Sequence, residues 1–141
     1  MKRIILSIIV LITFSSPVAL SLDFSNIDIA KINIERVKTE AQGGEAQSQY
    51  IMGYCFLTGT YVSPDMSKAI EWFCKSSDQE YREAMVVMGE FYYLGVDGYV
   101  EQDKRKAKEL FKEAASKGSK VAQTWLRNIR REDENGKCPV Y

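Results

Sequence analysis

Few side chains in this sequence are suited to catalysis. The chain contains no histidine, which is the usual general base near neutral pH and the commonest protein ligand of zinc. It also contains no Ser-x-x-Lys sequence, no glycine-rich phosphate loop and no Gly-x-Ser-x-Gly nucleophile motif. Its 19 carboxylates include no pair that is singled out by its position. The residue types therefore argue against an enzyme, and they indicate no metal site, no cofactor and no catalytic residues.

Three cysteines, Cys55, Cys74 and Cys138, are the remaining reactive side chains. If two antiparallel helices joined near Tyr61 carry Cys55 and Cys74, these residues lie about 9 Å apart along the helix axes at ~1.5 Å per residue. Bridged cysteines have Cα atoms within ~7 Å of each other, so this pairing is disfavoured. We interpret Cys55 as a core thiol. Cys138 could link the chain to another molecule.

Recognition chemistry is better represented than catalytic chemistry. Six of the eight positions that lie six and three residues before, and one and four residues after, Gly53 and Gly89 are Gln, Glu or Tyr, the others being Leu57 and Val86. On a helix these positions form one stripe. Tyrosine combines a large contact area with a hydrogen-bonding tip, so we predict a partner-binding face here. An alternative for Tyr50 and Tyr93 is packing against a neighbouring structural unit. The predicted face consists of Gln47, Tyr50, Tyr54, Glu83, Val86, Glu90, Tyr93, Thr124, Asn128 and Arg131.

The elements that must position this stripe are repeated along the chain. Gly53 corresponds to Gly89 at an interval of 36 residues, whereas Asp65 corresponds to Asp103 at an interval of 38. The second copy therefore carries two extra loop residues. A period of this length indicates stacked supersecondary units, because one unit alone cannot bury its apolar face.

Each copy is predicted to be a helical hairpin. The expected helices cover residues 45–57 and 65–77 in the first copy, and 82–94 and 103–117 in the second. Asp65 is expected to cap its helix. Glycine inside a helix costs about 1 kcal/mol relative to alanine, so Gly53 and Gly89 are expected where bulky Trp72 or Leu110 packs close to the backbone. The predicted buried stripes are Ala69, Ile70, Trp72, Phe73 and Ser76 in the first copy and Ala107, Leu110, Phe111, Ala114 and Ala115 in the second.

Shorter elements are expected on both sides of the hairpins. Apolar residues spaced three and four apart between Ile27 and Ala41 predict a leading helix over 22–44, capped at Ser25 or Asn26. Partial alternation of isoleucines leaves a strand open there. A final helix over 119–131 matches only the first half of a unit, and residues 132–141 are expected to fray.

The first 21 residues have the layout of a secretory signal peptide. Lys2-Arg3 precedes an apolar run over 4–14, and small residues flank Leu20 before an expected cut at Leu22. The run is shorter than the ~20 residues that span a bilayer, so the mature form is not expected to cross a membrane. An uncleaved membrane anchor is the alternative. Cleavage would leave the protein periplasmic or secreted.

Charge is spread unevenly over the mature chain. Residues 22–102 carry 6 Lys/Arg and 13 Asp/Glu, whereas residues 103–141 carry 11 and 6. The basic end is interpreted as a solvated helix face. A surface for an acidic partner or a membrane is the alternative. Nucleic acid is not expected to be a partner of an exported protein.

The same residue types recur in the same order in both copies. The first reads Ser48, Met52-Gly53, Phe56, Gly59, Asp65, Lys68-Ala69 and Trp72-Phe73, and the second reads Ala84, Met88-Gly89, Tyr92, Gly95, Asp103, Lys106-Ala107, Leu110, Ala114-Ala115 and Gly118. This pattern resembles the Sel-1-like repeat family, related to tetratricopeptide repeats, over about residues 44–127. Ser76-Ser77 replaces the usual Ala-Ala, and Leu110 replaces the usual aromatic residue.

The resemblance implies an all-α fold, a right-handed α-solenoid of antiparallel helix hairpins whose first helices line a concave groove. The organisation is then signal peptide 1–21, capping helix 22–44, repeats 45–81 and 82–118, and capping helix with tail 119–141. Such proteins commonly act as scaffolds or adaptors, often in the bacterial envelope. An exported adaptor with a peptide, helix or effector domain in its groove is therefore our hypothesis. An immunity protein that neutralises an antibacterial effector is the alternative, and an envelope hydrolase is disfavoured.

Overall fold

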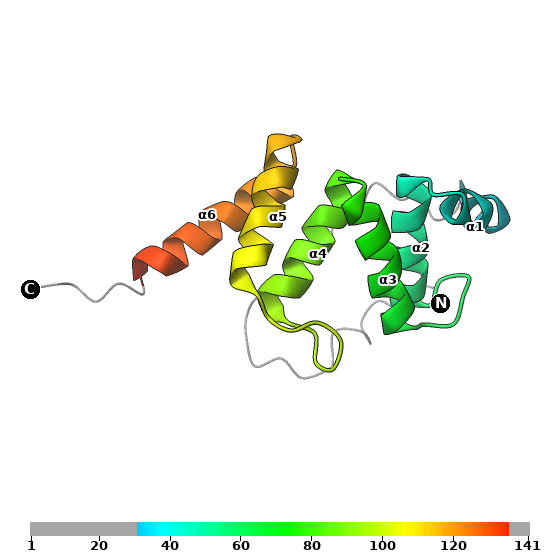
Figure 1. Cartoon of the computed structure of the whole chain (residues 1–141), viewed down its shortest axis with the longest axis horizontal. Coiled ribbons are helices and arrows are strands. Elements are labelled where there is room, and N and C mark those ends of the chain that lie inside the picture. Colours follow the sequence, from blue (N-terminus) through cyan, green and yellow to red (C-terminus); the bar gives the residue numbers. More distant parts are fainter. Residues whose placement is uncertain (1–30, 136–141) are drawn as a thin grey trace, which may run out of the picture.

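Six α-helices lie in the part of the chain that the computed structural model describes, residues 31–135 (Figure 1). Two hairpins, α2 with α3 and α4 with α5, are flanked by α1 and α6. None of these helices has both the length and the apolarity that crossing a membrane requires. The helices are α1 (Ile34–Gln42), α2 (Ala46–Thr58), α3 (Met66–Asp78), α4 (Arg82–Leu94), α5 (Lys104–Ser116) and α6 (Lys120–Asn135).

Matching aspartates begin the second helix of each hairpin. Asp65 accepts a hydrogen bond from the backbone N–H of Lys68 at 3.0 Å, and Asp103 accepts one from that of Lys106 at 2.9 Å. Each carboxylate therefore satisfies one of the free N–H groups of the first helical turn. The predicted cap at Asp65 is confirmed.

Removing one of these caps tests how much it stabilises the fold. We expect Asp103→Ala to lower the free energy of unfolding by about 1 kcal/mol, because the first turn of α5 loses its acceptor. Asp103→Asn should cost only a few tenths, since asparagine caps about as well. Urea denaturation measures both values. Equal losses for the two variants would contradict a capping role.

The outer helices differ from their predicted limits. Within the described residues the predicted helix over 22–44 begins only at Ile34, the start of α1, because Ile32 and Asn33 are not helical. Asn33 caps it by accepting from the backbone N–H of Arg36 at 3.2 Å. The predicted caps Ser25 and Asn26 lie outside the described residues. At the other end α6 continues to Asn135 instead of fraying from residue 132, and Glu132 bonds to the hydroxyl of Tyr93.

Gly53 and Gly89 do lie where two helices approach closely, but the neighbours differ from the prediction. A Cβ atom on Gly53 would lie 2.7 Å from the ring of Phe73, and one on Gly89 would lie 2.6 Å from the ring of Phe111. Trp72, predicted as the neighbour of Gly53, instead packs against the cluster of Val37, Ala41 and Met52 beside α1. Leu110, one residue before Phe111, is only partly buried. Adjacent residues point about 100° apart on a helix, so a one-residue error selects another face.

In α2 and α4 a glycine leaves space for the ring of a neighbouring helix, and α6 has no glycine at the equivalent position. Gly53 and Gly89 each follow the N-cap of their helix by eight residues. Ser119 caps α6 through a hydrogen bond to the backbone N–H of Ala122 at 3.1 Å, and the eighth residue after it is exposed Arg127. A second helix packing on α6 as α5 packs on α4 would meet this side chain.

Candidate functional site

The predicted binding stripe of the first hairpin lies between repeats. Tyr50 is buried, and its ring lies 5.8 Å from that of Phe73 and 5.4 Å from that of Tyr81. Tyr54 is buried in the same cluster, which includes Ala84, Val87 and Met88 of α4. The alternative interpretation of Tyr50, packing against the neighbouring unit, therefore describes its surroundings.

In the second hairpin the stripe lies beneath α6. The indole Nε1 of Trp125 donates a hydrogen bond to Oε1 of Glu90 at 2.8 Å. The Trp125 ring also lies 5.2 Å from the ring of Tyr93, and Val86 belongs to the same buried cluster. Burial raises the pKa of Glu90 to about 7, although the hydrogen bond from Trp125 acts in the opposite direction. These side chains join α4 to α6.

The predicted face is therefore accessible only at its margins. Glu83 is half-buried and its carboxylate lies 2.5 Å from the guanidinium of Arg82. A first helix contacts both its own second helix and the next unit, so little of its surface is left for a partner. The buried members are Tyr50, Tyr54, Val86, Glu90 and Tyr93, and the exposed ones are Gln47, Thr124, Asn128 and Arg131.

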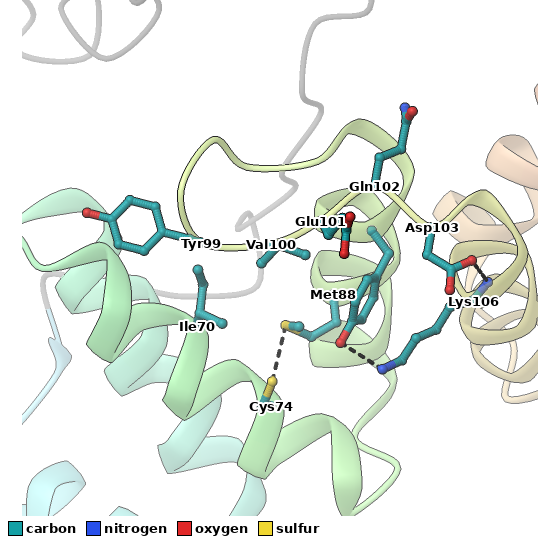
Figure 2. A pocket seen from close by; sticks show the side chains of 10 residues that line it. Ile70, Cys74, Met88, Tyr99, Val100, Glu101, Gln102, Asp103 and Lys106 are labelled. Atoms are coloured by element: carbon teal, nitrogen blue, oxygen red, sulfur yellow. Dashed lines mark hydrogen bonds between the residues drawn. The ribbon is translucent and has the colours of Figure 1, made fainter.

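A pocket of about 440 Å³ lies elsewhere, where the two repeats meet. Figure 2 shows it between α3, α4 and the loop that leads into α5. Ile70 and Cys74 come from α3, Met88 comes from α4, and Val100 comes from the loop. The floor is therefore mainly apolar, with sulfur atoms of Cys74 and Met88 4.0 Å apart.

One wall of the pocket is a small hairpin within the α4–α5 loop. Val96 and Val100 pair in an isolated antiparallel bridge, and Gly98 between them has a φ of 76°, which favours glycine. The hairpin presents Tyr99, which is 55% exposed. In Figure 2 its ring lies beyond Ile70, at the end of the pocket opposite Lys106. Among the described residues, the large hydrophobic side chains that are exposed to solvent are Tyr99 and Tyr61.

Polar groups gather at the far end of the pocket. The Lys106 ammonium donates a hydrogen bond to the hydroxyl of Tyr92 at 2.8 Å and lies 4.2 Å from the centre of its ring. That hydrogen bond raises the pKa of Lys106, so the side chain stays protonated while it is bonded to Tyr92. Residues 95–103 contribute Asp97, Glu101 and Asp103 and no lysine or arginine. The pocket thus combines an apolar floor with an acidic loop.

The cysteines show no sign of activation. Cys55 and Cys74 are free thiols. Burial raises the pKa of Cys55 to about 11, and burial also raises the pKa of Cys74. A thiol with a raised pKa carries little thiolate at neutral pH and is a poor nucleophile. Cys138 lies outside the described residues.

The sequence contained a signal for this pocket. The two extra residues of the second loop are the ones that allow its hairpin, and Tyr99 follows Tyr61 by 38 residues, the longer of the two intervals. Both loops lie along the lower edge of the molecule in Figure 1. Helical periodicity does not indicate either tyrosine as a binding residue, because a loop residue belongs to no periodic pattern.

Known proteins resemble this chain at two levels. The model of the Sel1 repeat matches residues 46–81 and 82–119. The secretory immunoglobulin A-binding protein EsiB of Escherichia coli O6:H1 (strain CFT073) is 35% identical over 45 residues, which are 32% of this chain and 9% of EsiB.

Solved structures share the arrangement of the helices. The protective antigen c5321 of uropathogenic Escherichia coli, with an SLR fold, has a TM-score of 0.66 and 35% identity over 72% of this chain. A Sel1 repeat protein from Oxalobacter formigenes has a TM-score of 0.63 and 25% identity over 67% of this chain and 70% of its own. Cysteine rich protein B of Helicobacter pylori, at 22% identity and a TM-score of 0.60, covers 74% and 77% and supports the fold alone.

The chain spans only 21% of c5321 and less of EsiB, so it corresponds to a small part of those proteins. The fold is nevertheless the one expected, an all-α solenoid of helical repeats. Sel1-repeat proteins generally act by binding other proteins. Since its two repeats together make up more than half of the sequence, this chain belongs to the Sel1 repeat family.

Proposed function

We infer that this chain is an exported protein-interaction module that binds a partner protein at the pocket beside Tyr99. The observation that carries this proposal is an exposed tyrosine next to a pocket with apolar side chains at its floor and polar ones at one end, at the junction of the repeats. Tyrosine is enriched at the centres of protein interfaces, and such centres fill pockets. The family's general activity in protein binding supports the same conclusion.

Export is proposed from the leader-like residues 1–21. A short basic start, an apolar run and small residues before Leu22 are typical of a cleaved signal peptide. The partner would then be a periplasmic or extracellular protein. EsiB, whose name records binding to secretory immunoglobulin A, is a precedent for a relative that binds an extracellular protein. Sequencing the N-terminus of the mature protein should find Leu22 first.

The partner segment should be both apolar and basic. An apolar side chain would fit between Ile70 and Val100, at the floor of the pocket. A neighbouring lysine or arginine would meet the carboxylates of the 95–103 loop and could stack on Tyr99. Lys106 does not oppose this strongly, since its ammonium is bonded to Tyr92.

Photo-crosslinking in cells of the source organism tests the surface. A benzoylphenylalanine placed at Tyr99 should give a specific adduct with one partner, whereas the same group at Tyr61, on the equivalent loop, should not. An adduct formed at Asn128 but not at Tyr99 would return the site to the predicted stripe. No adduct at any of these positions would contradict the proposal.

A charge reversal tests the chemistry of the partner. Glu101→Lys should weaken capture of the crosslinked partner several-fold, because it adds a positive charge beside the pocket. Glu71→Lys, an exposed change on α3, is the matched control and should leave capture unchanged. The partner's identity also separates two narrower functions. A toxic effector would assign the chain to immunity proteins, and a non-toxic envelope protein would assign it to adaptors.

A further inference from the structure

The carboxyl group of Glu90 is only half satisfied. It is fully buried, and Oε1 accepts the hydrogen bond from Trp125, but Oε2 has no hydrogen-bond partner among the described residues. Buried polar atoms are normally paired, and an unpaired buried charge is especially costly. A structural role alone would be met by a glutamine or an apolar side chain, so this acid invites a functional explanation.

Charged groups around this contact come from α5 and α6. Glu132 of α6 accepts a hydrogen bond from the hydroxyl of Tyr93, and the Lys104 ammonium of α5 lies 5.1 Å from the centre of the same ring. The helix α3 meets α4 through the sulfur atoms of Cys74 and Met88. The pKa of Glu90 is raised by burial and lowered only by the bond from Trp125, so no cation among the described residues compensates its charge.

The helix α6 takes part in this contact through Trp125, and it also packs on α5. Trp125 lies between Glu90, the ring of Tyr93 and the ring of Phe111, on which it stacks at 5.3 Å with an interplanar angle of 5°. An ionised Glu90 is more stable in contact with water than buried, and Trp125 of α6 is its hydrogen-bond partner in the buried state. Separation of α6 from α4 would hydrate the carboxylate and uncover Val86 and Tyr93.

We propose that Glu90 is a proton-operated latch, which holds α6 on α4 while it is neutral and releases α6 when it ionises. Release exposes the second-repeat part of the predicted binding stripe. The latch concerns the chain alone and does not depend on the pocket beside Tyr99 being a binding site.

The direction with pH follows from proton linkage. Docked Glu90 has a pKa of about 7, above its ordinary value of 4.5, so the docked state binds more protons. Docking is therefore strongest below about pH 4.5 and weakens as the pH rises through 7. A difference of this size corresponds to a factor on the order of 100 in the docking equilibrium.

Amide hydrogen exchange of the full chain at pH 5 and pH 8, corrected for the intrinsic exchange rate, measures the opening of α6. We expect the opening constant to rise on the order of 100-fold in the wild type and to stay nearly constant in Glu90→Gln. An equal rise in Glu90→Gln would overturn the proposal, and so would a wild type whose α6 opens equally at both pH values.

Two further measurements exclude simpler explanations. Glu132→Gln removes the other acid at this contact, and this variant should keep the pH dependence of α6 opening. If Glu132→Gln abolished the pH dependence, the titrating group would be Glu132 and the latch at Glu90 would be rejected. Because Glu90→Gln could fold poorly, ¹³C-carboxyl NMR titration of wild-type Glu90 provides an independent test. Titration near pH 7 supports the proposal, and titration near pH 4.5 contradicts it.

Discussion

Replacing Gly89 with valine should lower the free energy of unfolding by about 3 kcal/mol. A Cβ atom there would lie 2.6 Å and 2.9 Å from two atoms of the Phe111 ring, closer than side chains tolerate. The ring cannot retreat, because it is fully buried and stacks on Trp125. Valine forms helices only slightly better than glycine, so its propensity gain does not offset the overlap. Urea denaturation followed by circular dichroism measures the loss.

The matched control is Arg127→Val, at the equivalent position of α6. This side chain is exposed, so the change should alter the free energy of unfolding by no more than about 0.5 kcal/mol. Combining Gly89→Val with Phe111→Leu should recover part of the loss, since the smaller side chain makes room. If Gly89→Val were as mild as the control, close helix approach would not explain this glycine.

Phe73→Ala should be at least as damaging, with an expected loss of about 3–5 kcal/mol. Its ring is fully buried and lies 5.8 Å from that of Tyr50 in α2 and 6.0 Å from that of Phe91 in α4. Truncation to alanine therefore leaves a cavity where the two repeats meet. We also expect the repeats to unfold less cooperatively, because stacked units are stabilised through their interfaces.

Two variants calibrate that experiment. Phe73→Leu keeps most of the apolar volume and should cost about 1 kcal/mol. Tyr99→Ala removes an exposed ring and should leave stability nearly unchanged. Denaturation monitored by both far-ultraviolet circular dichroism and tryptophan fluorescence reports on cooperativity. Coincident curves for Phe73→Ala would contradict the predicted uncoupling of the repeats.

Sequence periodicity was sufficient to predict the helices of the two hairpins. The limits of α4 agree with the prediction, and those of α2, α3 and α5 differ by one residue at each end. This accuracy has a physical reason: aspartate caps, glycines and small residues recur at matching places, so each copy restrains the interpretation of the other. The outer elements have no second copy, and α1 and α6 are where the predicted limits were least accurate.

The solvent exposure of side chains on α2 and α4, the first helix of each hairpin, could not be predicted from periodicity. Spacing correctly places Tyr50 and Tyr54 on one stripe, and Glu90 and Tyr93 on its equivalent. Whether that stripe meets solvent depends on the angle between successive hairpins, which no single helix encodes. On α2 and α4 the stripe faces the next unit, so five of the ten residues predicted to bind a partner are buried. The pocket beside Tyr99 depends on a loop conformation that periodicity does not describe.

Arg127 also bears on how molecules of this protein meet one another. Helical repeats could continue from one molecule into another if a helix of one molecule packed on α6 as α5 packs on α4. On α6 the position needed for such packing is occupied by a charged, exposed side chain, whereas α2 and α4 have glycine there. Molecules are therefore discouraged from joining into filaments through α6, and the basic surface of α6 stays in water.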